Sequence, residues 1–329
     1  MASTELKGPR LPSKFEGISA WTAESLSEED WLFKLPKTAV TEIIELANYF
    51  DRNPIPVEAL TPDDFAIPEC RQILAAAKQA ATNGPRFAVI DRLPLDDISN
   101  EVAIRTYWVL MSLISRPVSQ KLDGSLLFSV EDSGRKPIPG SGVRPATTNV
   151  EQNFHNDNSF NGKPPEFVTL LCVNPAANGG GLSRVISLAS VHNVLSAKHP
   201  DVLNRLYEPV YFDRQKEHHP DDEPTISQPI FSYDGTLKVR LGTALVRAGY
   251  IVKGKALDAE TEGALETLIN VINDPGLWVE LMMERGQIQI VNNRETGHAR
   301  TGFEDVPGTP KRQLERLWLR DSGRRAYLG

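Results

Sequence analysis

The sequence predicts a β-rich α/β fold in which helices cover a closed or sandwiched β core. Short apolar runs typical of strands lie at both ends of the second half of the 329-residue chain, so their pairing must be largely non-local. Such pairing favours a closed or sandwiched architecture over a doubly wound parallel sheet. No internal repeat or low-complexity linker divides the chain, and 40% hydrophobic residues suffice for a sizeable core, so a single domain is the simplest arrangement.

The first part of the chain is expected to contain an arm and three helices. Residues 1–36 mix proline, serine and charge with isolated aromatics, which indicates an N-terminal arm that packs over the body with little regular structure. Residues 37–329 are assigned to the single domain. Apolar residues recur at helical spacing in three segments, with one short strand before the third. The helices are expected over 39–50, 69–82 and 100–115, and the strand over 87–90.

The second part supplies most strands, with helical insertions between them. Helical insertions are expected around residues 188–210 and 256–274, where apolar residues recur at a spacing of three and four. A segment rich in glycine, proline, serine and arginine at 131–149 is expected to be a mobile loop, of the kind that acts as a lid. Apolar runs bounded by turn residues indicate the strands. They are expected within 167–173, 178–186, 226–241, 278–283, 287–291 and 311–320.

Composition limits the partners and the compartment. The net charge of −7 and the isoelectric point near 5.5 argue against a general nucleic-acid or anionic-membrane surface. Only two cysteines occur, Cys70 and Cys172, so neither a disulfide framework nor a cysteine-type zinc site is predicted. No signal peptide or apolar run of membrane-spanning length is recognisable. We therefore expect a cytoplasmic protein that acts on a small molecule, while the sequence leaves a homo-oligomer open.

The segment 153–160 joins a histidine to a carboxylate at the spacing of a metal site. His155 and Asp157 lie two residues apart between apolar flanks, so on or beside a strand their side chains point to one face. An imidazole nitrogen and a carboxylate oxygen on one face can hold two adjacent positions of a divalent metal, and a second histidine completes a facial triad. A surface turn is the alternative interpretation, since asparagine and aspartate favour loops.

A second polar turn, within 290–303, contains the missing ligand type. His298 follows an apolar strand and is distant from His155 in the sequence, as expected when a metal triad is drawn from neighbouring strands. A further strand at 311–320 carries arginines at alternate positions, and one of them could grip a carboxylate by two parallel hydrogen bonds. The other histidines are interpreted as ordinary helix or loop residues: His192, His199, His218 and His219.

Taken together, these segments resemble the iron(II)- and 2-oxoglutarate-dependent dioxygenases of the taurine dioxygenase (TauD/TfdA) and clavaminate synthase-like family. The resemblance runs from about Phe87 to Tyr327. Ordered co-occurrence of several motifs is more specific than any one of them. The resemblance implies a double-stranded β-helix (jelly-roll) core with flanking helices. The motifs are His155-Asn156-Asp157 with Phe160 and Pro164-Pro165, the glycine turn before Ser183, Asn293-Arg294 to His298, and Arg312.

The resemblance also implies roles for five residues. His155, Asp157 and His298 would be the catalytic iron ligands and leave positions for 2-oxoglutarate and O2. Arg312 matches the arginine that binds the distal carboxylate of this cosubstrate, and Ser183 falls where a family hydroxyl assists it. Oxidative decarboxylation of 2-oxoglutarate would release succinate and CO2 and drive oxidation of a substrate carbon. Hydroxylation is expected, with desaturation or cyclisation as variants.

Four further residues are implied at the substrate. Arg316 falls where the taurine branch uses an arginine to hold the substrate anion, and an ion pair at the rim is the alternative interpretation. Glu151 falls at a substrate-contacting position of that branch. Asn158 and Ser159 are expected to line the pocket. An arginine and a glutamate on opposite sides would suit a small polar metabolite that is carboxylate- or amino-acid-like.

Two other classes of function stay open from the sequence. A zinc-type hydrolase could use the same triad to activate water, although no general base is evident beside it and Arg312 would have no role. A non-catalytic β-barrel binding protein could retain the same residues incidentally. An intact triad together with an anion-binding arginine weighs against this second alternative.

Overall fold

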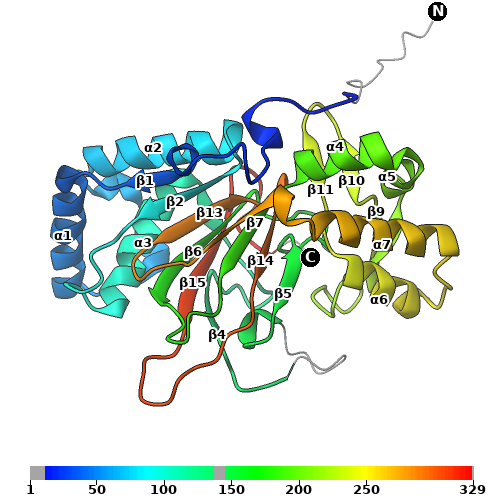
Figure 1. The fold of residues 1–329 in the computed structure, drawn as a ribbon. Coiled ribbons are helices and arrows are strands. Elements are labelled where there is room, and N and C mark those ends of the chain that lie inside the picture. Colours follow the sequence, from blue (N-terminus) through cyan, green and yellow to red (C-terminus); the bar gives the residue numbers. More distant parts are fainter. Residues whose placement is uncertain (1–11, 137–144, 328–329) are drawn as a thin grey trace, which may run out of the picture.

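The computed structural model describes residues 12–136 and 145–327, which form a mixed α/β fold (Figure 1). The strands lie in two larger sheets and two small two-stranded sheets. The centre of the loop predicted at 131–149 falls outside the described residues. Among the helices of the described part, none combines the length and the apolar content that a membrane crossing needs.

The largest sheet has seven strands, and its three central strands come from the second half of the chain. β13, β6 and β15 at its centre are antiparallel, and valine, isoleucine and leucine dominate the first two, as expected for buried strands. The hydrogen-bonded order is β1 (Leu32–Lys34), β2 (Phe87–Asp91), β13 (Ile288–Asn292), β6 (Phe167–Asn174), β15 (Gln313–Arg320) and β3 (Arg116–Val118), with β4 (Leu127–Glu131) also paired to β15.

The second sheet has four antiparallel strands. Its order is β12 (Trp278–Leu281), β7 (Ser183–Ser187), β14 (Thr296–Arg300) and β5 (Gln152–His155). From β4 to β15 the chain passes repeatedly between the two sheets, so strands distant in sequence become neighbours, as the scattered apolar runs predict. The small sheets pair β8 (Val210–Asp213) with β9 (Thr225–Gln228) and β10 (Phe231–Tyr233) with β11 (Leu237–Val239).

Three helices form a layer beside the outer face of the largest sheet, with the first of them farthest from it (Figure 1). They are α1 (Lys37–Arg52), α2 (Pro68–Asn83) and α3 (Asn100–Ile114). α2 and α3 pack against the sheet and α1 packs against α2 and α3, and Trp108 and Met111 of α3 are completely enclosed. The three helices confirm the prediction made from helical spacing.

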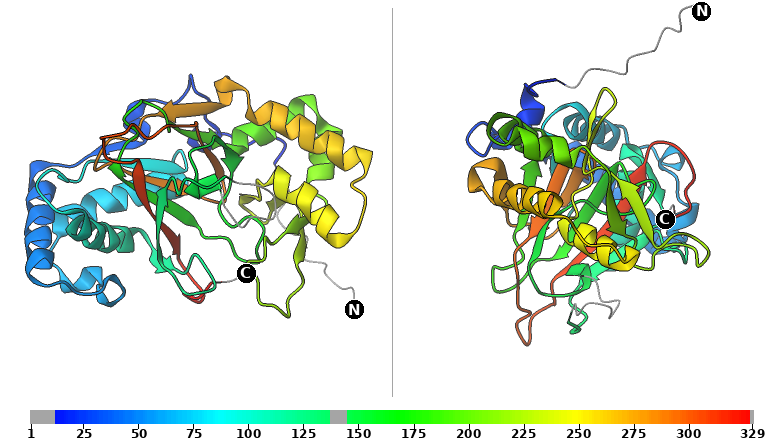
Figure 2. Two further views of the ribbon diagram at one scale, coloured as in Figure 1. Left: turned by 90° about the horizontal axis from the view of Figure 1, so that it is seen from below. Right: turned by 90° about the vertical axis from the view of Figure 1, so that its right-hand side faces the viewer.

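The remaining helices form a second layer on the opposite side of the molecule (Figures 1 and 2). They are α4 (Leu188–Lys198), α5 (Pro200–Leu206), α6 (Thr243–Lys253) and α7 (Ala259–Ile272). Their apolar side chains and those of the small sheets make a core of their own. The predicted insertion at 188–210 contains two helices instead of one, because Pro200 has no N–H to continue α4 and begins α5.

The sequence pattern does not predict α6. Gly249 lies within this helix and lowers its intrinsic helix propensity. Glycine is required there, because a Cβ at position 249 would lie 2.3 Å from the carbonyl oxygen of Tyr211 in β8. Close packing on β8 therefore accounts for α6 better than local preference does.

The N-terminal arm contacts α4 and the turn between α2 and β2. The N–H of Phe15 donates to Oδ1 of Asn193 in α4 at 2.8 Å, and the indole N–H of the buried Trp21 donates to the carbonyl of Pro85 at 2.8 Å. The arm then adds β1 to the largest sheet, parallel to β2. Apart from β1, its described part contains only two short 3-10 turns.

Candidate active site

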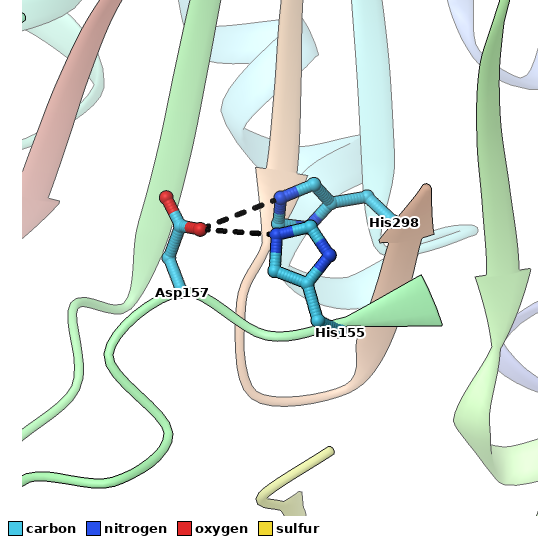
Figure 3. A group of neighbouring side chains, drawn as sticks. All are labelled: His155, Asp157 and His298. Carbon is cyan, nitrogen blue, oxygen red and sulfur yellow. Dashed lines mark ion pairs between the residues drawn. The ribbon is translucent and has the colours of Figure 1, made fainter. Parts of the chain in front are cut away.

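The neighbouring strands β5 and β14 bring the predicted metal ligands together. His298 of β14 is paired with His155 of β5, and Asp157 follows two residues after His155. Oδ1 of Asp157 lies 3.3 Å from Nε2 of His155 and 3.7 Å from Nε2 of His298 (Figure 3). One ligand atom from each residue lies within 4.8 Å of the other two. Two imidazole nitrogens and a carboxylate oxygen that converge in this way fit a facial triad for Fe(II).

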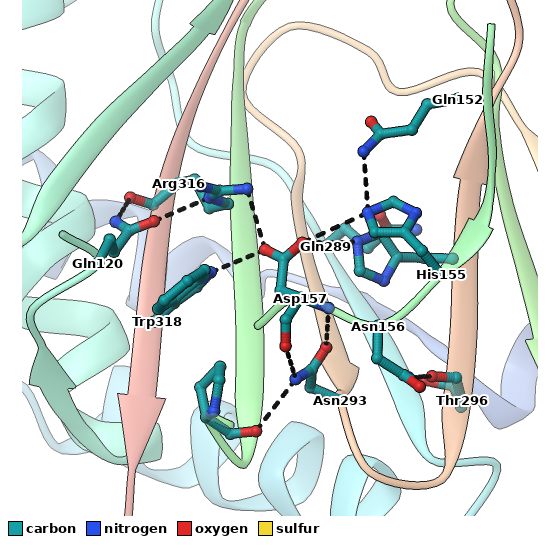
Figure 4. Close-up of polar contacts among 12 residues, drawn as sticks. Gln120, Gln152, His155, Asn156, Asp157, Gln289, Asn293, Thr296, Arg316 and Trp318 are labelled. Carbon is teal, nitrogen blue, oxygen red and sulfur yellow. Dashed lines mark hydrogen bonds and ion pairs between the residues drawn. The ribbon is translucent and has the colours of Figure 1, made fainter. Parts of the chain in front are cut away.

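The two carboxylate oxygens of Asp157 have different neighbours. Oδ1 faces the histidines, whereas Oδ2 accepts a hydrogen bond from the indole N–H of Trp318 at 2.7 Å and lies 3.0 Å from Nη1 of Arg316 (Figure 4). Burial of Asp157 by itself would raise its pKa, but the positive charge of the Arg316 guanidinium holds the pKa well below its usual range. Asp157 is therefore ionised and directs one oxygen to the metal position.

Hydrogen bonds also orient His155. Its Nδ1–H donates to the carbonyl of Asn153 at 2.9 Å, which leaves Nε2 as the unprotonated ligand nitrogen. The amide nitrogen of Gln152 lies 2.9 Å from the same Nε2 and donates to it (Figure 4). The pKa of the buried His298 is lowered, first by burial and then by the nearby His155. A neutral imidazole is the form that binds a metal.

Two asparagines hold the turn that carries Asp157. Asn293 accepts from the Asp157 N–H through Oδ1 and donates through Nδ2 to the Asp157 carbonyl, both at 2.8 Å (Figure 4). Asn156 donates to the carbonyl of Thr296 at 2.6 Å and accepts from the N–H of Leu241 at 2.7 Å. Both asparagines belong to the sequence motifs, and the structure shows that they fix the backbone beside the triad.

Arg312 lines a cavity of about 50 Å³ that the triad also lines. Only 4% of Arg312 is exposed, its Nη1 has no hydrogen-bond partner among the described residues, and its guanidinium lies 4.9 Å from the ring centre of Phe303. Burial lowers the pKa of Arg312 to about 10, so the guanidinium stays protonated at neutral pH. A buried cation of this kind favours an anionic ligand.

Ser183, at the start of β7, lines the same cavity. Its hydroxyl donates to Oε1 of Gln289 in β13 at 3.0 Å, which joins the second sheet to the largest one. The motifs assign no role to Gln289. A polar residue within the apolar run 288–291 is the sequence signal that could have marked it.

A larger cavity of about 320 Å³ lies beside the triad, and the four residues predicted to contact substrate line it. They are Arg316, Glu151, Asn158 and Ser159. Nδ2 of Asn158 and Oγ of Ser159 are buried without a hydrogen-bond partner among the described residues. Buried polar groups normally have partners, so these two atoms are suited to bind a ligand.

Two of these four residues also have partners of their own. The Glu151 carboxylate is 58% exposed and lies 3.4 Å from Nη1 of Arg184. Arg316 is buried, pairs with Asp157 and donates through Nε to Oε1 of Gln120 at 2.8 Å. Arg316 is thus an ion-pair partner, as the alternative interpretation has it, but its guanidinium is enclosed beside a residue of the triad and does not lie at an exposed rim.

Comparison with known proteins identifies the family. The profile described as "Taurine catabolism dioxygenase TauD, TfdA family" matches residues 53–318, a span that contains the triad, Ser183 and Arg312. The chain belongs to this family. It is a 2-oxoglutarate-dependent dioxygenase with Fe(II) as cofactor, as the sequence motifs predict. The zinc hydrolase and the non-catalytic binding protein are therefore set aside.

Two curated relatives match nearly the whole chain. FR-33289 synthase of Streptomyces rubellomurinus is 24% identical over 315 residues, which cover 94% of this chain and 91% of that protein. The taurine hydroxylase-like protein SAT17 of Stachybotrys chartarum is 25% identical over 321 residues, which cover 94% of this chain and 80% of that protein.

Solved structures of oxygenases share the fold. Asparagine oxygenase (AsnO) superposes with a TM-score of 0.64 at 18% identity, covering 89% of this chain and 94% of that one. The non-heme iron oxygenase OrfP in complex with Fe and alpha-ketoglutaric acid superposes with a TM-score of 0.66 at 15% identity, covering 88% and 94%. These likenesses confirm the mixed α/β fold predicted from the sequence.

Proposed function

We propose that this dioxygenase hydroxylates a carbon of a small polar metabolite that is carboxylate- or amino-acid-like, with release of succinate and CO2. The observation that carries the proposal is the position of the triad between two cavities. The small cavity contains the buried cation Arg312 and suits the cosubstrate, whereas the cavity of about 320 Å³ is large enough for a second small molecule. Desaturation or cyclisation of the same substrate would use the same site.

In this proposal His155, Asp157 and His298 hold the iron, which together with 2-oxoglutarate and O2 supplies the oxidant. The protein side chains position the reactants. Arg312 attracts the distal carboxylate of the cosubstrate, and Ser183 supports that end of the cavity. Arg316 forms an ion pair with Oδ2 of Asp157, which leaves Oδ1 as the oxygen that would bind the metal.

The polar groups of the larger cavity support an amino-acid-like substrate. Asn158 and Ser159 offer unpaired groups, Arg316 offers positive charge, and Glu151 offers a carboxylate for an ammonium group. Among the solved structures, asparagine oxygenase is found with 3-hydroxyasparagine and OrfP with L-Arg. Both molecules are amino acids, so amino acids and their derivatives are the first substrates to test.

The order of the strands supports a double-stranded β-helix, or jelly-roll, as the core. β4, β6, β13 and β15 lie in the largest sheet, whereas β5, β7, β12 and β14 lie in the second sheet. Successive strands thus wind back and forth between two antiparallel sheets, with the triad at the end of β5 and within β14. We assign this activity to residues 37–329, with residues 1–36 as an arm. Both cysteines are buried free thiols, which suits the reducing cytoplasm.

Anaerobic addition of Fe(II) followed by 2-oxoglutarate tests the cosubstrate site. A weak visible charge-transfer band is expected from the wild-type protein and should be lost in His155→Ala and Asp157→Ala. Both variants should keep a cooperative thermal transition, because neither residue belongs to an apolar core. Folded wild-type protein that develops no band would contradict the proposal.

The substrate is then sought by screening metabolites, beginning with amino acids, for stimulated release of succinate. With a substrate identified, Arg316→Ala is expected to raise the substrate KM much more than the 2-oxoglutarate KM, because Arg316 lines the larger cavity. The assay is run at saturating Fe(II), since Arg316 also contacts Asp157. An unchanged substrate KM would remove Arg316 from the substrate site.

A further inference from the structure

Gln289 occupies a central position on the inner face of the largest sheet. It is paired with Leu170 of β6, and Leu170 is paired in turn with Arg316 of β15, so the three side chains share one face. Only 1% of Gln289 is exposed. Gln289 lines the same cavity as the three residues of the triad, and Figure 4 labels it near His155 and Asp157. Its amide therefore lies inside the active site and not in the apolar layer under α1 to α3.

The oxygen of the Gln289 amide has a hydrogen-bond partner among the described residues, but its nitrogen has none. Oε1 accepts the hydroxyl proton of Ser183 at 3.0 Å, and a serine hydroxyl has only one proton to donate. Nε2 of Gln289 has no hydrogen-bond partner among the described residues and is buried. A buried N–H without an acceptor is unfavourable, so this geometry is stable when a ligand supplies the acceptor.

The cation of Arg312 lines the same cavity as this amide, close to the turn that precedes β7. Nη2 of Arg312 lies 3.5 Å from the carbonyl of Gly181, two residues before Ser183. Nη1 of Arg312 also lacks a hydrogen-bond partner among the described residues, and both side chains line the cavity of about 50 Å³. A charged donor and a neutral donor thus share one cavity, which matches the two oxygens of a carboxylate.

We propose that Gln289 is the neutral donor to the distal carboxylate of 2-oxoglutarate, and that Ser183 is a positioning residue that holds the Gln289 amide. The proposal rests on the cosubstrate site described under the proposed function. It reverses the expectation that the Ser183 hydroxyl itself assists this carboxylate. Because Ser183 donates its proton to Oε1, Nε2 is directed to the cosubstrate, where it acts together with Arg312.

The test measures the dissociation constant of 2-oxoglutarate for anaerobic Fe(II) enzyme by titration of the visible band. Gln289→Met removes both ends of the amide, whereas Gln289→Glu keeps an acceptor for Ser183 and removes the N–H donor. Each is expected to weaken 2-oxoglutarate at least about tenfold, since a hydrogen bond to a charged group is lost. Ser183→Ala should raise the dissociation constant of 2-oxoglutarate less, about threefold. In the double variant with Gln289→Met, the Ser183 substitution should cause no further loss of affinity.

A shorter 2-oxo acid shows which end of the cosubstrate is bound. 2-Oxobutyrate lacks the distal carboxylate, so its affinity should be the same in wild-type enzyme and in Gln289→Met. Equal losses for both 2-oxo acids would overturn the proposal. So would a Ser183→Ala loss as large as that of Gln289→Met, or wild-type affinity in Gln289→Glu.

Folding and function are kept apart by two controls. Thermal unfolding is recorded for every variant, and Gln289→Glu, which retains the hydrogen bond to Ser183, decides the result if Gln289→Met does not fold. Wild-type enzyme that fails to bind 2-oxoglutarate would refute the proposed function itself. Wild-type binding with unaffected Gln289 variants would refute only the role of Gln289.

Discussion

The two carboxylate oxygens of Asp157 have different roles. Oδ2 is held by Trp318 and Arg316, and Oδ1 faces the two imidazoles. Partners of this kind, which contact a metal ligand without touching the metal, usually tune metal affinity. Sequence motifs identified Asp157 as a ligand but could not identify Trp318. Trp318 lies on the same face of β15 as Arg316, and only the antiparallel packing of the sheets places that face beside Asp157.

Trp318→Phe is expected to weaken metal binding about tenfold, because the indole N–H donor to Oδ2 is lost while an aromatic ring remains. The measurement is an anaerobic titration of metal-free protein with Fe(II) or Co(II). Trp108→Phe is the matched control, since it also loses a buried indole hydrogen bond, to the carbonyl of Leu60, but lies under the largest sheet. Equal metal affinity in the two variants would show that Trp318 does not support the site.

At the scale of elements, the glycine-rich turn before β7 acts through its backbone. Gly181 has a φ of +72°, and a Cβ there would lie 2.5 Å from Nε of Arg312. The turn therefore allows Arg312 to pass close to the chain. The sequence contained no sign that a distant arginine packs on this turn.

Gly181→Ala is expected to lower the affinity for 2-oxoglutarate about tenfold, because the new methyl group displaces the Arg312 side chain. Gly179→Ala is the matched control. Gly179 also has a positive φ, of +77°, but nothing lies within 4 Å of a Cβ there, so it carries the same backbone strain without the contact. Titration of the visible band measures both affinities, and a similar loss in the two variants would attribute the effect to strain alone.

The helices show which elements local pattern can predict. α1, α2 and α3 have regular apolar stripes that face one shared core, so their spacing identifies them. α6 was not predicted, because glycine lowers helix propensity and Gly249 therefore argues against a helix in the sequence. Its close contact with β8, which requires glycine, is visible only in the structure.

At the scale of the whole molecule, the second helical layer depends on a histidine that the sequence assigned to an ordinary helix position. His192 of α4 is 1% exposed and packs against the rings of Phe15 and Phe231, and its Nε2 lies 3.0 Å from the hydroxyl of Tyr207. Burial lowers the pKa of His192 to about 4. The arm, α4 and the small sheet thus meet at a side chain that must stay neutral.

This burial predicts a loss of stability in mild acid. The pKa of His192 is about 4 in the folded protein and about 6.5 in an unfolded chain, so the unfolded state binds the proton first. Above about pH 6.5 the protonation of His192 does not affect the free energy of unfolding. As the pH falls from 6.5 toward 4, it lowers this free energy increasingly, by up to about 3 kcal/mol.

Denaturant unfolding at a series of pH values measures this effect. The free energy of unfolding of His192→Gln should depend less steeply on pH between 6.5 and 4 than that of wild type. His219→Gln, in an exposed loop, is the control and should keep the wild-type slope. Parallel curves for wild type and His192→Gln would contradict the prediction.

The sequence by itself determined the chemistry, because a metal triad needs particular residue types in short motifs. His155, Asp157 and His298 could be recognised in this way, as could most helices and part of the strands. The short strands β1, β3, β4 and β8 were not predicted, and the segment of β14 was expected to be a polar turn. Only the tertiary structure decided that Arg316 and Trp318 share one oxygen of Asp157, and that Ser183 faces Gln289. These contacts join strands of different sheets or distant segments of the chain, so local sequence patterns cannot predict them.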